Sequence, residues 1–323
     1  MNKNKLNMFY TFRHSFLISA LLLSASFYLL SIPAKAQSDT IRLEKLSTGH
    51  RAACLTLQHK LPLKAMLESG IPFPILDSTF VFQNSALLNL SLKPSEISMN
   101  LNGEKIRCYY QTEDTVFLNR QIYTGITLIA NLRSRGIDMM YPVQTFCTPE
   151  DNIPSCIIEL NLKRNYMRQL TRKELSFIQH QYSELTLRKG DYGKMYNLEA
   201  EFAIKDKTGK IATLRGKFIP DLGNIIFLAL FENHPNVKDF IQNTAIPLQQ
   251  GLNKKGQPMP VKAMHIKEGV FNKKVPFSNV VFMITPHFTQ LESDGFLGLD
   301  FLRHFDVIFD FSNHRFYFKK ADE

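Results

Sequence analysis

The stretch that decides the fold lies near the C-terminus and reads FLGLDFLRHFDVIFDF, from Phe296 to Phe311. It begins with two apolar residues and a glycine, Phe296-Leu297-Gly298, and ends in an apolar run, Phe305–Phe311. The turn-like residues 312–315 separate this run from a second one at 316–318. Two apolar runs around a short polar turn predict a β-hairpin near the end of the chain.

Two pairs of similar segments predict an internal repeat. The strand pattern Ile157–Leu162 resembles the closing hairpin, and Asn161 lies 149 positions before Asp310. Each half also contains an apolar stretch followed by an acid, one residue and a glycine. These triplets are Glu68-Ser69-Gly70 and Asp221-Leu222-Gly223, and their acids are 153 positions apart. Chance similarity between β segments is the alternative, but two anchors with nearly the same offset favour two similar lobes of about 150 residues.

The rest of the chain is rich in strand patterns and contains 26 Phe. Aromatic and β-branched residues favour a pleated, half-buried surface. A capping box of Thr171 and Glu174 begins a helical pattern that continues to Leu185. We therefore expect a mainly β fold with a few short helices, and a joint between the lobes at this helix or near residues 188–191.

The first 36 residues have the pattern of a secretory signal peptide. Lys3, Lys5 and Arg13 supply a basic start. An apolar stretch from about Phe16 to Ile32 follows, and Ala34-Lys35-Ala36 supplies an A-x-A exit. A retained membrane anchor is the alternative, but the apolar stretch is marginal in length for a span. We expect residues 1–36 to be removed and the protein to be exported, to the periplasm or the extracellular space, without stable membrane insertion.

Composition and charge exclude several classes of protein. The apolar fraction of 44% is sufficient for a buried core, which excludes wholesale disorder. The net charge is +10, but four of the bases lie in residues 1–36, so the exported chain carries +6. The other bases are scattered and form no stripe interleaved with aromatic residues. We therefore expect no nucleic-acid partner.

All four cysteines lie in the first half of the chain. Cys147 and Cys156 bracket a loop-like stretch and make a plausible local disulfide in an exported protein. Cys54 and Cys108 would then pair by elimination, which is one of three possible connectivities. No C-x-x-C motif is present, so the cysteines do not indicate a zinc site. We expect neither a metal nor a cofactor.

These features together resemble the retropepsin-like and pepsin-like aspartic peptidases, particularly their exported bacterial relatives. The hallmark of that family is Asp-Thr/Ser-Gly after an apolar strand, followed later by two apolar residues and a glycine. The two acid triplets and Phe296-Leu297-Gly298 resemble these elements, and the stretch from about Asp294 to Lys319 resembles the family's closing helix and hairpin. The resemblance implies two β-barrel lobes, at residues 37–187 and 188–323, with a cleft between them.

The resemblance also implies a pair of catalytic carboxylates, Glu68 and Asp221. Two close carboxylates share one proton, because both cannot comfortably ionise. The ionised one draws a proton from a water that attacks a peptide carbonyl, and the protonated one hydrogen-bonds the carbonyl oxygen. Four residues would support the acids by bracing their loops or by permitting close backbone approach: Ser69, Gly70, Gly223 and Gly298.

Departures from the family pattern fall where the chemistry is most exacting. Glu68 stands where Asp is expected, and a misplacement of roughly 1 Å can cost on the order of a hundredfold in rate. Leu222 stands where Ser or Thr would supply a bracing hydroxyl. In the first half, Phe146-Cys147-Thr148-Pro149 takes roughly the place of the apolar-apolar-Gly element. These departures predict reduced or absent cleavage. The alternative function is therefore a non-catalytic protein that binds a peptide or an exported protein partner.

Other interpretations of the acids also follow from the sequence. Glu68 and Asp221 would be turn acids in a protein of another fold. Asp77 has the setting of a helix N-cap, and Asp310 is expected to pair with a neighbouring turn. There is no G-x-S-x-G, H-E-x-x-H or phosphate-binding glycine loop, so other catalytic chemistries have no support. The substrate and the oligomeric state are not specified.

Overall fold

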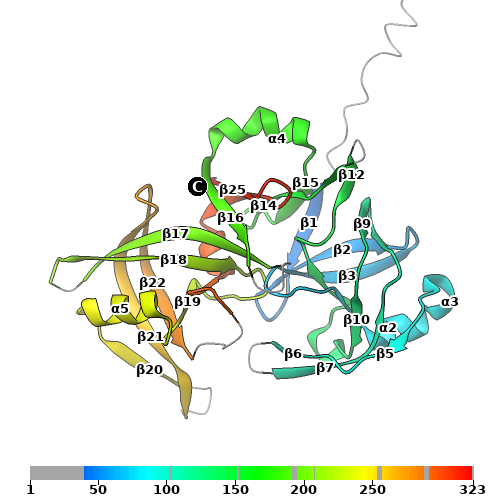
Figure 1. The fold of residues 1–323 in the computed structure, drawn as a ribbon, viewed down its shortest axis with the longest axis horizontal. Coiled ribbons are helices and arrows are strands. Elements are labelled where there is room, and N and C mark those ends of the chain that lie inside the picture. The colour runs from blue at the N-terminus through cyan, green and yellow to red at the C-terminus, as the bar shows by residue number, and fades with distance from the viewer. Residues whose placement is uncertain are drawn as a thin grey trace, which may run out of the picture. The chain divides into compact units, whose positions relative to one another are not determined.

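A computed structural model describes residues 40–101, 104–150, 153–190, 195–206, 208–252, 257–286 and 291–321. These residues belong to one unit, Thr40–Glu323, and consist mainly of strands with a few short helices (Figure 1). The predicted mainly β class is confirmed. The predicted signal peptide, residues 1–36, lies outside the described residues. None of the helices within the described ranges is long and apolar enough to cross a membrane.

An antiparallel sheet of six strands connects the two halves of the chain. In order across the sheet these strands are β1 (Thr40–Lys45), β15 (Tyr166–Gln169), β14 (Ile157–Asn161), β24 (Phe305–Asp310), β25 (Arg315–Lys320) and β16 (Ser183–Lys189). The middle pair joins the two predicted hairpins, with Ile157 opposite Asp310 and Asn161 opposite Asp306. Asp310 accepts hydrogen bonds from Asn313 in the hairpin turn, as expected. The central sheet thus holds one half of the chain against the other.

The first lobe is built from the strands between the outer strand β1 and the hairpin β14–β15. They are β2 (Arg51–Leu57), β3 (Leu61–Glu68), β4 (Ile75–Asp77), β5 (Lys93–Pro94), β6 (Ser98–Leu101), β7 (Glu104–Thr112), β8 (Val116–Leu118), β9 (Gln121–Tyr123), β10 (Thr127–Ala130), β11 (Met139–Pro142), β12 (Thr148–Glu150) and β13 (Ile153–Ser155). β1 belongs to both the central sheet and the first lobe, because its first residues pair with β15 and its last residues with β2.

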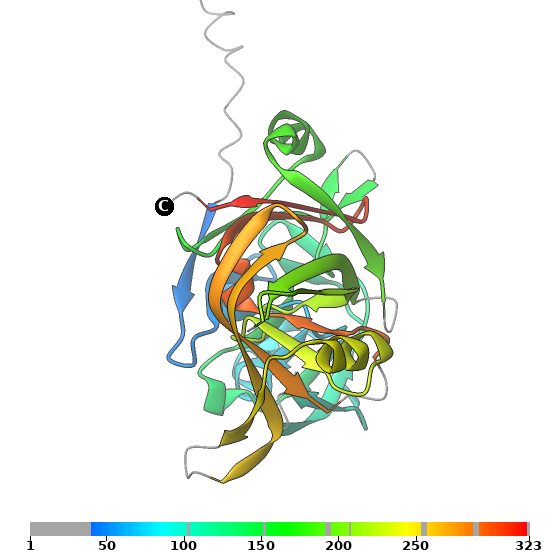
Figure 2. The same ribbon diagram turned by 90° about the vertical axis from the view of Figure 1, so that its left-hand side faces the viewer.

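The second lobe contains longer strands. They are β17 (Tyr196–Lys205), β18 (Ile211–Pro220), β19 (Leu228–Phe231), β20 (Leu248–Leu252), β21 (Pro258–Phe271), β22 (Val275–Thr285) and β23 (Gly295–Leu297). β21 and β22 form a strongly twisted hairpin, coloured yellow to orange in Figure 2. Phenylalanines fill the lobe: the Phe202 ring centroid lies 5.2 Å from that of Phe271 and 5.4 Å from that of Phe218. The abundance of Phe therefore serves packing.

The same strand pairings surround both acid triplets. β3 pairs in parallel with β11, as β18 does with β23. β11 and β23 then pair antiparallel with β4 and β19, and these pair in parallel with β10 and β22. The two-lobed β architecture is therefore confirmed by the arrangement of strands. The sequence repeat itself and the lobe boundaries stay predictions.

The first-lobe counterpart of Phe296-Leu297-Gly298 is not where the sequence placed it. Leu297 lies opposite Pro220, the residue before Asp221, whereas Pro142 lies opposite the acid Glu68 itself. The matching residues are thus Met140-Tyr141-Pro142. The assignment to residues 146–149 was wrong because that segment lies beyond the end of β11, where Cys147 forms a bridge with Ile122. The first lobe has proline where the second has Gly298.

The helices of the described residues are short. They are α2 (Ser78–Gln83), α3 (Ser85–Leu88), the 3-10 helix η1 (Arg133–Arg135), α4 (Arg172–Ile178), the 3-10 helix η2 (Gln179–Gln181), α5 (Pro235–Asn243) and α6 (Leu299–Leu302). Asp77 caps α2, and Thr171 and Glu174 form the predicted capping box of α4. The predicted helix is shorter than expected, because residues 183–186 pair with β25 instead of continuing it.

The cysteine predictions have mixed outcomes. Cys147 and Cys156 form the predicted disulfide, next to the β12–β13 ladder, in which Thr148 lies opposite Ser155. The Cys54–Cys108 pairing was wrong, since both thiols are free. Cys54 points outward from β2, whereas Cys108 is buried in the core, so the two side chains face different environments.

Candidate active site

The two acids of the triplets stand at equivalent ends of equivalent strands. Glu68 is the last residue of β3, and Asp221 follows the last residue of β18. The Asp221 N–H donates to the Leu297 carbonyl at 2.7 Å, and the Val143 N–H donates to the Glu68 carbonyl at 2.9 Å. Each acid is therefore held by the parallel neighbour of its own strand, at the point where the chain leaves the sheet.

Each acid lies against the glycine of the other triplet. A methyl group placed on Gly70 would lie 2.7 Å from Asp221 Oδ1, and one placed on Gly223 would overlap the Glu68 carboxylate. The overlap at Gly223 is the more severe of the two. Glycine is required at both positions for this close approach. The structure thus brings together four of the predicted residues, Glu68, Gly70, Asp221 and Gly223.

Ser69 braces the loop of the opposite acid. Its hydroxyl donates to the Pro220 carbonyl at 2.6 Å and accepts from the Leu222 N–H at 2.9 Å. Ser69 is buried, so both hydrogen bonds are shielded from water. Within its own lobe, the Gln144 side-chain amide donates to the Ile71 carbonyl at 2.8 Å and supports the Ser69 loop from behind. Ser69 therefore has the bracing position that the sequence predicted.

Leu222 supplies no matching brace in return. Its side chain is 1% exposed and belongs to the main apolar core. The Asp221 loop has a further hydrogen bond of its own, since the Gly223 N–H donates to Asp221 Oδ1 at 2.9 Å. The departure from the family pattern at Leu222 thus removes a hydroxyl that would brace the Glu68 loop, while the Asp221 loop keeps its brace from Ser69.

Gly298 lies behind the Asp221 loop. A methyl group on Gly298 would lie 2.6 Å from the Asn224 carbonyl oxygen, and the Leu299 N–H donates to that same carbonyl at 2.7 Å. This glycine is buried and supports the loop through backbone packing. Asp300, two residues further on, forms an ion pair with Arg303 at 3.2 Å on the surface.

The electrostatic environment gives the two carboxyls different pKa values. Glu68 is only 4% exposed, and its pKa is raised well above its usual value by burial and then by the Asp221 charge, with Arg135 opposing. Burial raises the pKa of Asp221 to about 6, against the lowering effect of the Gly223 hydrogen bond. Asp221 is the more accessible of the two. Glu68 is therefore the carboxyl that keeps its proton.

Both acids line a cleft of about 820 Å³, and residues of both lobes form its walls. Among the described residues of that lining, the acidic or Lys/Arg side chains are Glu68, Asp221 and Arg135; His50 also lines it. Most of the remaining lining is apolar, and methionines recur on both sides: Met66, Met99, Met140, Met195, Met259 and Met283. Flexible, polarisable methionine side chains suit apolar groups of varied shape.

Sequence reasoning missed three residues of this site. His50, Arg135 and Gln144 reach it from a turn, a 3-10 helix and the segment after β11. None belongs to a motif, and His50 is isolated in the sequence, so no local signal distinguishes them. Across the described residues, no three His, Cys, Asp or Glu side chains are grouped so that they could hold a metal ion.

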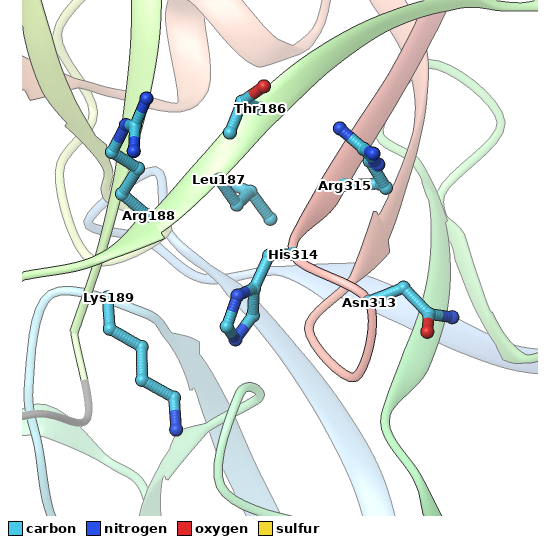
Figure 3. Close-up of a pocket in the computed structure, with 7 residues that line it drawn as sticks. All are labelled: Thr186, Leu187, Arg188, Lys189, Asn313, His314 and Arg315. Carbon is cyan, nitrogen blue, oxygen red and sulfur yellow. The ribbon is translucent and has the colours of Figure 1, made fainter.

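A second hollow of about 470 Å³ lies between β16 and the β24–β25 turn. Figure 3 shows Lys189 and His314 extending to one side, with the guanidinium groups of Arg188 and Arg315 turned the other way. Arg188 pairs with Glu199, and Arg315 pairs with Glu184 at 3.2 Å. These ion pairs neutralise the two arginines, so the hollow is a weaker candidate than the acid-lined cleft.

Comparison with known proteins bears on the fold. No family model matches the chain, and no curated protein matches it. Among solved structures, an aspartic proteinase from Irpex lacteus matches with a TM-score of 0.52. The match covers 88% of this chain and 98% of that chain, at 11% sequence identity. The fold is that of an aspartic proteinase.

At this low identity the likeness concerns the fold alone. The aspartic-proteinase fold of this chain carries Glu68-Ser69-Gly70 and Asp221-Leu222-Gly223 on equivalent loops of its two lobes. The chemistry of the site therefore has to be argued from these residues themselves.

Proposed function

We propose that the protein is an exported aspartic-type endopeptidase whose paired carboxylates activate water. The observation that carries this proposal is the placement of Glu68 and Asp221, each against the other triplet's glycine and both lining one cleft. The description of the solved neighbour as an aspartic proteinase supports the same class of activity. The apolar lining favours peptide substrates with apolar side chains on both sides of the scissile bond.

The two acids take different roles in this mechanism. Asp221 is the base and removes a proton from water as the water oxygen bonds to the peptide carbonyl carbon. Glu68 holds the shared proton and donates a hydrogen bond to the carbonyl oxygen, where negative charge develops. When the C–N bond breaks, the leaving nitrogen receives a proton from the pair. The hydrogen bond from Gly223 favours the ionised form of Asp221.

Binding without cleavage is the second candidate function. Glu68 in place of Asp and Leu222 in place of Ser or Thr are the observations that favour it. The same cleft would then hold an extended peptide or a segment of another exported protein. The two functions differ in whether a bound peptide is cut.

The pH dependence of cleavage tests the proposal. The purified protein is expected to cleave an unfolded protein, with kcat/KM rising as the pH increases through about 6, because Asp221 must ionise. The rate should fall again at higher pH as Glu68 loses its proton. Fragments identified by mass spectrometry across a pH series provide the measurement. Peptide binding by calorimetry with no fragments at any pH would replace cleavage by the binding function.

Export is part of the same proposal. The basic, apolar and A-x-A segments of residues 1–36 predict a mature chain that begins at Gln37. Intact-mass measurement of the protein recovered after cell fractionation checks this, and the expected location is the periplasm or the medium. A membrane-bound protein that retains Met1 would contradict it.

A further inference from the structure

We propose that His50 is a positioning residue that holds the Asp221 loop to the first lobe, in addition to the brace that Ser69 supplies. His50 Nε2 lies 2.9 Å from the Gly223 carbonyl oxygen, and the two residues are 173 positions apart in the chain. The inference rests on the proposed function, since it concerns the alignment of the same acid pair.

The turn that carries His50 is well ordered by its own hydrogen bonds. It connects β1 to β2, and the Leu46 and His50 ends are joined by a hydrogen bond from the Leu46 N–H to the His50 carbonyl at 2.9 Å. The Gly49 N–H donates to the Leu46 carbonyl at 2.9 Å, and Gly49 has a φ of 93°, which favours glycine. A methyl group on Gly49 would contact Ile225 at 3.4 Å, so this turn packs directly against the Asp221 loop.

The imidazole has a defined hydrogen-bonding role. A carbonyl oxygen only accepts, so Nε2 carries the hydrogen that is donated to Gly223. Nδ1 lies 2.8 Å from the Thr48 hydroxyl, which fixes the orientation of the ring. Burial, with a smaller contribution from Arg135, lowers the pKa of His50 against the opposing effect of the Gly223 carbonyl. A neutral ring with its hydrogen on Nε2 satisfies both contacts, because Nδ1 then accepts from Thr48.

Gly223 contacts both acids and also His50. Its N–H donates to Asp221 Oδ1, its α-carbon lies against the Glu68 carboxylate, and its carbonyl accepts from His50. Ser69 holds the Pro220 and Leu222 peptides, which leaves the far side of the loop to His50. The first lobe therefore holds the Asp221 loop at both ends, with a serine at one and a histidine at the other.

Substitutions of His50 by Leu, Asn and Gln test this role in the full chain. His50→Leu is expected to lower kcat by about tenfold to a hundredfold, the scale set by misplacement of a reacting group, with KM changed less than twofold. The acidic limb of the pH profile should move to higher pH, because a displaced Gly223 N–H no longer favours ionised Asp221. His50→Gln places an amide nitrogen near the position of Nε2 and should restore much of kcat. His50→Asn, whose amide nitrogen is near the position of Nδ1, should not.

The same variants include a readout that does not require cleavage. The titration of the Asp221 carboxyl, followed by ¹³C NMR, should shift to higher pH in His50→Leu and His50→Asn and return in His50→Gln. The exposed His180 supplies the control, since His180→Gln should change neither readout. If the unaltered protein does not cleave but these shifts occur, the peptidase proposal fails and the role of His50 stands. Folded His50→Leu and His50→Asn proteins with unchanged kcat and unchanged Asp221 titration would overturn the inference.

Discussion

Asp221→Asn is expected to abolish peptide cleavage, with a loss in kcat of about a thousandfold or more. The change removes the base that takes the proton from water, and general base catalysis contributes on the order of a hundredfold to ten-thousandfold. Asn has nearly the same shape as Asp, so the hydrogen bond from the Gly223 N–H to the side-chain oxygen can persist. Initial rates on the same unfolded substrate measure the effect.

Asp300→Asn is the matched control for this prediction. Asp300 is an acid two residues after Gly298, but it pairs with Arg303 on the surface and is not among the described residues that line the cleft. Its substitution should leave cleavage within about twofold of the unaltered protein, as expected of a surface change. Cleavage that survives in Asp221→Asn would show that the acid pair is not the catalytic group.

Asp221→Asn should be more stable than the unaltered protein at pH 7. Loss of cleavage in this variant would then not be due to unfolding. The folded pKa of Asp221 is raised, so its favourable contribution is complete below the unfolded pKa near 4 and disappears as the pH rises through about 6. Above that pH the unaltered protein keeps a buried charge that Asn does not have. The expected gain in unfolding free energy at pH 7 is at most about 3 kcal/mol, by linkage. Denaturant unfolding at pH 4 and pH 7 measures it, and the gain should be absent at pH 4.

Gly223→Ala is expected to disrupt both acids through one methyl group. The added carbon would overlap the Glu68 carboxylate, so either Glu68 or the Asp221 loop must move. A displacement of roughly 1 Å lowers the rate on the order of a hundredfold, and overpacking a buried site costs about 1–3 kcal/mol of stability. Kinetics and denaturant unfolding of the same preparation measure the two effects.

Gly209→Asn serves as the comparison for a glycine without such a contact. Gly209 has open space around its α-carbon and a φ of 86°, a conformation that Asn tolerates. This variant should keep its rate and lose little stability. Wild-type behaviour of Gly223→Ala would contradict the close contact between the two triplets.

The sequence predicted the parts of the site that are defined by local patterns. An apolar strand, an acid and a glycine occur together in the chain, so Glu68 and Asp221 could be identified without coordinates. The same holds for the hairpin that contains Asp310 and for the capping box at Thr171. Each of these features depends on residues within a few positions of one another.

The remaining parts depend on contacts between distant segments. His50 shows no pattern of its own, and its role arises from a hydrogen bond to Gly223 on the other lobe. The spacing up to Leu185 fits a helix, but pairing with β25 makes residues 183–186 a strand. Cysteine counting paired Cys54 with Cys108, although both thiols are free, the first exposed and the second buried. Periodicity and counting contain no information about such tertiary contacts.

The pairing of β14 with β24 bears on whether either lobe could exist alone. These strands come from different halves of the chain. They pair with each other along their length, from Ile157 opposite Asp310 to Asn161 opposite Asp306. A separately expressed half would present an unpaired edge strand, which invites self-association and aggregation. Joining both halves in one polypeptide covers the two edges with each other. It also keeps the local concentration of each half high, so formation of the acid pair does not depend on the cellular level of the protein.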